Sequence, residues 1–435
     1  MKIITTLTTF AVRFSPVGCI MTGTLFSTAP LHAQNIRAWD NGGSTTNWSE
    51  AANWSDDTVP GNAYEAQLGD AASGTIDVPD KTAQPRAIRF LDTGTSVTDD
   101  ITVRMASGTT WRLIVPGTGG GVFVDGGTRN QTLDLNGGTL ILGQSSTLGL
   151  KDVCITNNGA GRLVFTPGNL NMTGTNGGDA GASVHIKFDG TGTVTVDSNL
   201  GMEATTNPTT FLISQTGSGA TTLNGANTWN GATTVSAGAL WVNGTHTGGA
   251  AWSVTGGTLG GSGTITTAGD AGVIIGTGGK LSAGAESATG TLTMNLGAGS
   301  LDLGAALTGD SASLLFRLGA TDASDKIALG SGSSLNIGSG VLDFGDFVFT
   351  TGEGFGAGTY ILISTTTTIV GTLADGQLSG AIGGFEAKLA LAADNKALLL
   401  TVVTAVPEPA TTAILLGGLC GILVTAFRKH RRTTV

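Results

Sequence analysis

The sequence is short of cysteine, of charged residues and of good helix formers, and each shortage argues against a class of protein. Only three of the 435 residues are cysteine. Cys19 and Cys420 fall in apolar segments at the two ends, so Cys154 alone is left in the body and no disulfide framework is expected. Charged residues make up 12% of the chain. Gly (71 residues) and Thr (68 residues) are weak helix formers, whereas Thr suits a pleated surface, so an α-rich enzyme is not expected.

The sequence also lacks the motifs of common phosphate and acyl-transfer sites. It holds no G-x-G-x-x-G and no G-x-S-x-G, and its Gly279-Lys280 pair is followed by Leu281 rather than by Ser or Thr. A zinc site needs three or four ligands at short spacing, whereas His185 and His246 are the two histidines of the body and lie far apart. We therefore expect no cofactor and no metal.

The body carries a strong negative charge. Residues 34–406 hold 15 basic and 30 acidic residues, which gives a net charge of −15. A field of this sign repels phosphate backbones, so no nucleic-acid partner is expected. A contact with acidic extracellular polysaccharide that is bridged by cations stays open.

Short apolar triplets recur along the body, each bounded by Gly, Asn or Thr-Gly. Short strands with turn signals at this spacing are typical of a solenoid, in which each turn of the coil stacks on its neighbours. Gly and Asn supply the positive φ angles that tight corners need. The triplets are LDL at 133, LIL at 140, LVF at 163, VTV at 194, FLI at 211, LWV at 240 and VII at 273.

One stretch within this pattern, residues 219–265, has a clearer repeat. It contains GANTWNGATTV followed directly by SAGALWV, and residues 224–243 carry most of this order. The stretch resembles the autotransporter-associated β-strand repeat. This resemblance implies a right-handed parallel β-helix on an exported protein.

The N-terminus has the layout of a signal peptide, which we expect over residues 1–33. Two basic residues precede an uncharged stretch, and the segment LHAQ then offers a cleavage site between Ala33 and Gln34. The alternative is a lipoprotein signal that uses the segment PVGC, with Cys19 as the lipidated residue.

Three features follow one another over residues 404–435. A VPEP sequence comes first, an uncharged stretch at 411–427 that is long enough for a short transmembrane helix comes second, and a basic cluster at 428–432 comes last. The VPEP sequence, with its PEP motif at 407–409, consists of Val406, Pro407, Glu408 and Pro409. The basic cluster consists of Arg428, Lys429, Arg431 and Arg432.

This order resembles the PEP-CTERM sorting signal. The resemblance implies recognition by a membrane-embedded exosortase, an inner-membrane-anchored precursor, and delivery to the cell surface or extracellular matrix of a bacterium that makes exopolysaccharide. A buried core helix at 411–427 is the alternative, but the adjacent basic cluster favours a membrane segment.

Both ends of the solenoid are predicted to carry caps, with the coil itself at 71–300. Longer strands at 301–403 predict an antiparallel C-terminal β cap, and residues 34–70 predict an N-terminal cap with three tryptophans. The alternative role of these tryptophans is to stack on sugar rings, since a row of turns could turn them to solvent. They are Trp39, Trp48 and Trp54.

Carboxylates are the remaining route to catalysis. β-Helix lyases and glycosidases place acids on neighbouring rungs, and the segment TDDITVR offers Asp99, Asp100 and Arg104. The alternative interpretation is a solvated acidic face. We interpret Cys154 as a small packed hydrophobe between two apolar neighbours, and the two histidines as surface or rung-end residues.

These observations predict an all-β chain: a right-handed parallel β-helix with an antiparallel end cap and a single C-terminal transmembrane helix. We expect a non-enzymatic, exported cell-surface or extracellular-matrix protein that is sorted by an exosortase and associated with exopolysaccharide, biofilm or adhesion. The alternative is a polysaccharide lyase or glycoside hydrolase on the same scaffold.

Overall fold

A computed structural model describes most of the body of the chain. The described residues are 35–79, 84–92, 99–114, 120–143, 150–173, 183–203, 210–308 and 312–404. The expected signal peptide and the whole sorting tail, including Ala33, Gln34, the VPEP sequence, the 411–427 helix and the basic cluster, lie outside these residues.

The described part is all-β, as the composition predicts. Its helical segments are 3-10 turns of three residues, and none of the described helices is long and apolar enough to cross a membrane. The four turns are η1 (Ala51–Asn53), η2 (Ser55–Asp57), η3 (Ala306–Thr308) and η4 (Phe344–Asp346).

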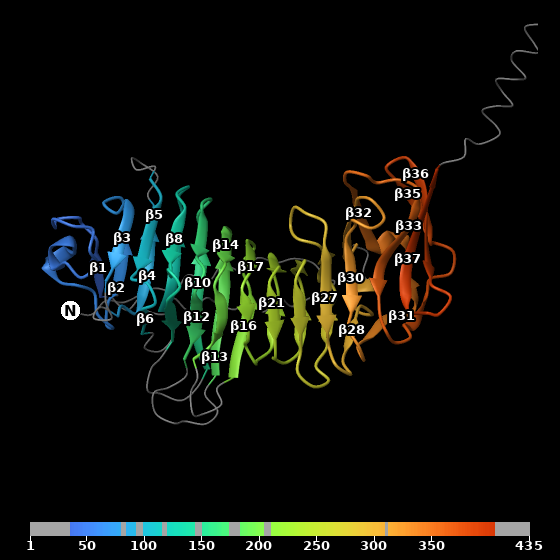
Figure 1. Cartoon of the computed structure of the whole chain (residues 1–435), viewed down its shortest axis with the longest axis horizontal. Coiled ribbons are helices and arrows are strands. Elements are labelled where there is room, and N and C mark those ends of the chain that lie inside the picture. Colours follow the sequence, from blue (N-terminus) through green and yellow to red (C-terminus); the bar gives the residue numbers. More distant parts are fainter. Residues whose placement is uncertain are drawn as a thin grey trace, which may run out of the picture. The chain divides into compact units, whose positions relative to one another are not determined.

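The strands form long parallel sheets, because each coil gives one strand to each face and the next coil adds its own strand alongside (Figure 1). The first sheet, in spatial order, consists of β1 (Ile36–Ala38), β2 (Glu65–Leu68), β4 (Ala87–Leu91), β7 (Gly120–Asp125), β10 (Leu150–Asn157), β13 (Ser183–Gly190), β16 (Thr210–Gln215), β19 (Thr233–Val235), β22 (Trp252–Val254), β25 (Val273–Ile275), β28 (Ser300–Asp302), β31 (Ser334–Leu342) and β34 (Val370–Leu373).

The other faces of the coil are built in the same way. The second sheet consists of β3 (Gly74–Val78), β5 (Ile101–Met105), β8 (Gln131–Asp134), β11 (Arg162–Phe165), β14 (Thr193–Val196), β17 (Ala220–Leu223), β20 (Ala239–Val242), β23 (Thr258–Gly261), β26 (Lys280–Ala283), β29 (Leu314–Leu318) and β32 (Phe347–Thr351). The third sheet consists of β6 (Thr110–Leu113), β9 (Thr139–Leu142), β12 (Asn169–Met172) and β15 (Asn199–Met202).

The fourth sheet continues the third face and ends in antiparallel strands. It consists of β18 (Ala226–Asn227), β21 (Thr245–Thr247), β24 (Thr264–Thr266), β27 (Thr291–Asn295), β30 (Lys326–Leu329), β33 (Gly358–Ser364), β37 (Ala397–Thr404), β36 (Phe385–Leu391) and β35 (Ser379–Ile382). Each coil contributes strands to three faces, and these strands pair in parallel with those of the next coil. This arrangement is a parallel β-helix. Its right-handed sense stays a prediction.

The core is a set of inward columns that run from coil to coil. In the second sheet Leu240, Leu259 and Leu281 occupy one register position on successive strands, and all three are buried. Full burial of such a side chain contributes about 1.5–3 kcal/mol. Within each strand, the residues that alternate with these buried positions point outward. Trp241, between the buried Leu240 and Val242 of β20, is an example.

Buried asparagines tie the corners of neighbouring coils together. The Asn157 amide donates to the carbonyl oxygen of Gly161 at 2.9 Å and to that of Thr193, one coil further on, at 2.8 Å. Asn227 repeats the arrangement, because its amide donates to the carbonyl oxygen of Thr245 in the next coil at 3.1 Å. Buried backbone carbonyls need such partners wherever the sheet ladder is interrupted.

The parallel coil is longer at both ends than the range 71–300 expected from the sequence. It begins with the β1–β2 pair, inside the expected N-terminal cap, and it continues past residue 300 to the β31–β34 pair. Among the described strands, antiparallel ladders form at β33–β37, β36–β37 and β35–β36, and isolated antiparallel bridges occur elsewhere, as between Trp39 and Trp54. Apolar alternation with a period of two is the same in parallel and antiparallel strands, so the pattern could not place this boundary.

Gly261 marks a point where adjacent coils leave no room for a side chain. Its φ is 134°, and a Cβ there would lie 2.1 Å from the carbonyl oxygen of Val242. Gly269 has a φ of 60° but faces open space. Both Gly→Ala changes carry a backbone cost of about 1–3 kcal/mol, because both φ angles are positive. We expect Gly261→Ala to cost about 1–3 kcal/mol more because of the overlap, measured as urea unfolding midpoints. Equal shifts for the two variants would contradict this.

Candidate functional site

The three tryptophans of the N-terminal cap pack against one another inside the first coils. Trp54 makes edge contacts with Trp39 and Trp48, at ring-centroid distances of 5.2 and 4.7 Å, and Trp48 meets Trp111 of β6 at 5.1 Å. The indole N–H of Trp54 donates to the carbonyl oxygen of Trp48 at 2.7 Å. The cap interpretation therefore fits the structure.

The alternative glycan-stacking role of Trp39, Trp48 and Trp54 is wrong. All three rings are buried, with at most 4% of their surface exposed, so none has an open face for a sugar. The physical reason is that the first coil would otherwise expose its apolar interior at this end, and large rings are the most effective cover.

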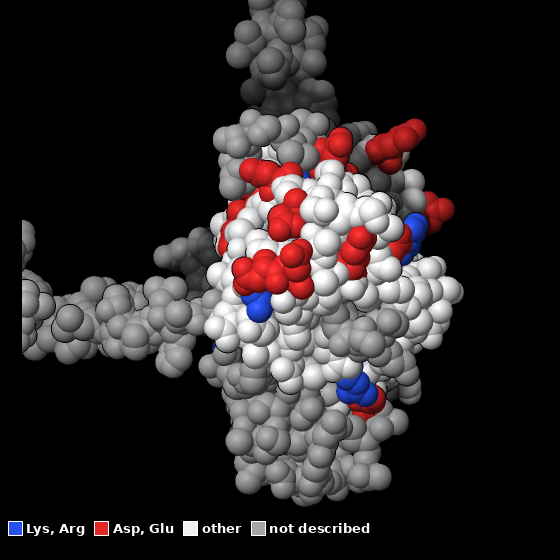
Figure 2. Space-filling model, turned by 90° about the vertical axis from the view of Figure 1, so that its left-hand side faces the viewer, with Lys and Arg blue, Asp and Glu red and all other residues white. Residues whose placement is uncertain are grey.

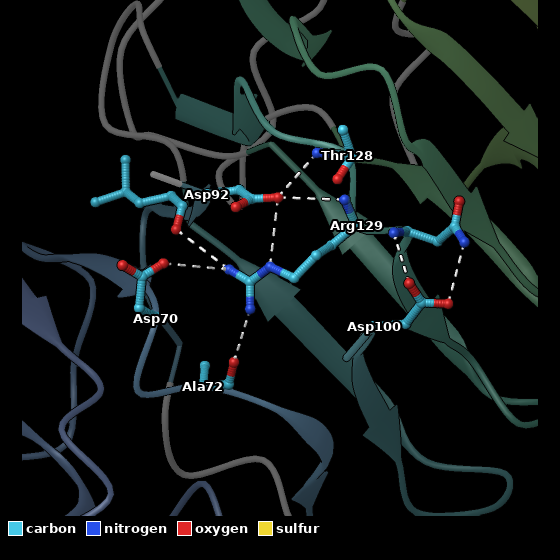
Figure 3. A network of polar contacts seen from close by, with 8 residues as sticks. Asp70, Ala72, Asp92, Asp100, Thr128 and Arg129 are labelled. Carbon is cyan, nitrogen blue, oxygen red and sulfur yellow. Dashed lines mark hydrogen bonds and ion pairs between the residues drawn. The ribbon is translucent and has the colours of Figure 1, made fainter. Parts of the chain in front are cut away.

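A buried arginine crosslinks three of the first coils (Figure 3). The Arg129 side chain is 1% exposed; its Nε lies 3.4 Å from Asp92 and its Nη2 lies 3.9 Å from Asp70. Its Nη1 donates to the carbonyl oxygen of Ala72 at 3.1 Å. Asp92 also accepts from the backbone N–H of Thr128 at 3.0 Å. Asp92 thus pairs with Arg129 and also accepts a backbone hydrogen bond. A buried ion pair needs such additional hydrogen bonds to offset the cost of desolvating its charges.

The sequence candidates Asp99, Asp100 and Arg104 do not converge. Asp100 accepts two hydrogen bonds from Asn130 on the next coil, at 2.8 and 3.0 Å. Arg104 instead reaches back to Asp77 on the preceding coil, at 2.7 Å, and Asp99 is exposed. Asp100 contacts the following coil and Arg104 the preceding one, so the three side chains do not form one site. They give the lyase alternative no support.

Acidic side chains gather on the N-terminal end of the coil. Figure 2 views this end and shows more acidic than basic side chains, as the sign of the net charge predicts. Among the described residues no group of three or more His, Cys, Asp or Glu side chains is placed to hold a metal ion. The exposed acids of the first coils are Asp40, Asp56, Asp57, Asp99 and Asp100.

His246 is a core residue, which corrects its expected place at the surface. It is fully buried between Trp229 and Trp252, at ring-centroid distances of 4.0 and 5.3 Å. Its Nε2 lies 3.1 Å from the carbonyl oxygen of Trp229, so this nitrogen carries the proton. Burial lowers the pKa of His246 to about 4 although that carbonyl favours the charged form.

His185 lies on the outer face of the first sheet, within a chain of polar contacts that crosses three coils. Its Nδ1 lies 3.2 Å from Asp152 on β10, and its Nε2 lies 2.6 Å from the hydroxyl of Ser214 on β16. Lys187, two residues along β13, donates to the other oxygen of Asp152 at 2.6 Å. Burial lowers the pKa of His185, while Asp152 raises it.

Cys154 faces outward beside this cluster and is half-buried. Strand alternation places it on the opposite face of β10 from Val153 and Ile155, which corrects the expectation that it packs between them. Burial raises the pKa of its thiol, and Asp152 raises it further. A neutral thiol is a weak nucleophile.

No motif in the sequence indicated the roles of Asp152, Lys187 and Ser214. Ser214 is 29 residues from His185, and Lys187 is 35 residues from Asp152. The register of the coils is the signal that could have found them, since Asp152 pairs with His185 and Lys187 pairs with Ser214 across adjacent strands.

Comparison with family models matches two parts of the chain. Residues 213–242 match the passenger-associated-transport-repeat, and residues 405–432 match the PEP-CTERM protein-sorting motif. The chain carries both motifs. The passenger-associated-transport-repeat covers β17, β18, β19 and β20 and overlaps the repeat expected at 219–265. No curated protein matches the chain.

These matches confirm both resemblances drawn from the sequence. The PEP-CTERM motif indicates export, association with the cell surface and processing by an exosortase. Its first residue follows Thr404, the last residue of β37, so the motif begins directly where the described strands end.

His246 makes stability depend on pH. Its pKa is about 4 when folded and 6.5 in the unfolded chain, so the unfolded state binds more protons between these values. The free energy of unfolding is therefore highest above pH 6.5 and falls as the pH is lowered toward 4, by about 3 kcal/mol at most. We expect urea midpoints of the unmodified chain to fall more steeply over this range than those of His246→Gln.

Asp325 changes the pH dependence of stability in the opposite direction, but it is present in both chains, so its effect cancels when their urea midpoints are compared. Burial raises the pKa of Asp325 to about 6, so this group loses stability as the pH rises through that range. Parallel pH profiles for the unmodified chain and His246→Gln would show that His246 does not titrate as stated.

Proposed function

We propose that the protein is a non-enzymatic β-helix scaffold of the cell surface or extracellular matrix, which associates with exopolysaccharide in biofilm or adhesion. The observation that carries the proposal is the PEP-CTERM motif at 405–432, attached directly to the last strand of a coil with a continuous core. In this proposal the precursor is held in the inner membrane by residues 411–427 until the exosortase releases it.

Regular outward rows of small polar residues support a role in contacting polymers. On the second sheet Thr75, Thr102 and Thr132 occupy one outward position on successive strands. Adjacent strands lie about 4.8 Å apart, so these hydroxyls repeat at a fixed spacing along the coil. An extended polysaccharide chain is a partner with repeating hydroxyls of its own.

Trp241 is the aromatic side chain best placed for such a partner. It stands in the same outward row, beside Thr222, and its ring covers Gly260 so closely that a Cβ there would lie 2.3 Å away. It is half-buried, whereas the other six tryptophans of the chain are buried. A tryptophan ring that is only partly covered keeps apolar surface available for a sugar.

The sorting part of the proposal predicts the ends of the mature chain. We expect the intact mass of protein recovered from the cell surface and the medium to fit a chain that starts near Gln34 and ends near Pro409. Cleavage at the expected signal site and near the PEP motif is the reason. Recovery of a chain that still carries Arg432 from both fractions would contradict release by the exosortase.

The polysaccharide part predicts different effects of two tryptophan changes. Trp241→Ala should reduce retention of the full chain on immobilised alginate with calcium several-fold, because it removes a partly exposed stacking surface. Trp54→Phe, which changes a buried ring, should leave retention unchanged.

Unchanged retention after Trp241→Ala would contradict the stacking role. The alternative, a polysaccharide lyase or glycoside hydrolase, predicts unsaturated or new reducing ends when the chain is incubated with alginate and calcium. Appearance of such ends would overturn the non-enzymatic proposal.

A further inference from the structure

The contacts of His185 have the order of a nucleophile, a base and an orienting carboxylate. The Ser214 hydroxyl lies 2.6 Å from Nε2, and a carboxylate oxygen of Asp152 lies 3.2 Å from Nδ1 of the same ring. A carboxylate this close to the ring favours the positive charge that forms when Nε2 accepts a hydroxyl proton, and loss of that proton makes the serine oxygen nucleophilic. This order is recognised by geometry rather than by position in the sequence.

The coil itself fixes the arrangement. Asp152 and His185 are direct partners across β10 and β13, and Ser214 is the direct partner of Lys187 across β13 and β16. The three side chains therefore stand on strands whose backbones are bonded to each other, which limits their freedom. Lys187 holds the second oxygen of Asp152 at 2.6 Å and thereby orients the carboxylate.

We propose that Ser214, His185 and Asp152 form an acyl-transfer site that hydrolyses short-chain carboxylic esters. Ser214 and His185 are the catalytic residues, and Asp152 is a positioning residue. Ser214 is 7% exposed, which leaves access for a small acyl group only, such as a short ester on a polysaccharide hydroxyl. The site is independent of the sorting motif and of glycan stacking at Trp241. It adds one activity to the proposed scaffold, which then acts on esters but not on glycosidic bonds.

The reaction balances with water as the co-substrate. The Ser214 oxygen attacks the acyl carbon while His185 takes the hydroxyl proton, and the ester C–O bond then breaks as His185 returns this proton to the leaving alcohol. Water next attacks the acyl-serine while His185 takes one of its protons. The bond between the acyl carbon and the Ser214 oxygen then breaks as His185 returns the proton to that oxygen, and the carboxylic acid leaves.

This site differs from the lyase and glycosidase alternative. Glycoside hydrolysis relies on a pair of carboxylates, whereas this cluster has one carboxylate, Asp152, which is paired with Lys187. Cys154, the other nucleophile nearby, is held neutral by its raised pKa.

An active-site probe tests the proposal on the full chain. An alkyl fluorophosphonate should label Ser214, located by peptide mass mapping, and the chain should hydrolyse p-nitrophenyl acetate. Ser214→Ala and His185→Asn should each lower the hydrolysis rate at least about 100-fold. Ser253→Ala is the matched control, because Ser253 stands two strands along in the same outward row and should leave the rate unchanged.

The variants separate loss of chemistry from loss of fold. Thermal melting is measured for each chain, and His185→Asn keeps the Ser214 hydroxyl while removing its base. Absent labelling, labelling at another residue, or unchanged hydrolysis in a folded Ser214→Ala or His185→Asn chain would overturn the proposal.

The pH profile tests the positioning role of Asp152. The titratable groups that face His185 are Asp152 on β10 and Lys187 on β13, and β16 contributes the uncharged Leu212 and Ser214. Hydrolysis should rise with pH as His185 loses its proton, with a midpoint below 6.5, because burial lowers the pKa of His185. Asp152→Asn should move this midpoint to lower pH, since Asp152 raises that pKa. An unmoved midpoint would contradict the positioning role.

Discussion

The structure depends on parallel pairing in register between successive coils. A single coil buries little apolar surface by itself, so its inward residues are covered only when neighbours stack at the same register position, as Leu240, Leu259 and Leu281 do. A slip by one residue would turn every inward side chain to solvent. The buried asparagines reinforce the register, because Asn157 and Asn227 donate across the corner to the next coil.

A stack held together in this way has two ends that must be closed. The first coil is covered by large aromatic rings, with Trp54 packed between Trp39 and Trp48. The last coils are closed differently, because the fourth sheet turns antiparallel at β33, β37, β36 and β35. The rings cover the apolar interior at the first coil, and the antiparallel strands extend the fourth sheet past its last parallel pair. The PEP-CTERM motif then follows β37 directly.

The same register decides which outward side chains become neighbours. Residues one or two coils apart in sequence become neighbours, and the contacts of the buried Arg129 with Asp92, Asp70 and Ala72 hold three coils together. The Asp152, His185 and Ser214 contacts arise by the same route. Stacking thus provides both a stable scaffold and the means to place chemically useful groups at fixed distances.

The sequence alone determined the all-β class, the coil and both motifs, because Gly, Asn and Thr at the corners and short apolar triplets are local signals. It did not determine where parallel pairing ends, since one alternation serves both strand directions. Nor could it show that Trp48 and His246 are buried or that His185 contacts Ser214. Those facts depend on contacts between coils, and only the tertiary structure sets the register that brings residues 29 positions apart within hydrogen-bond distance.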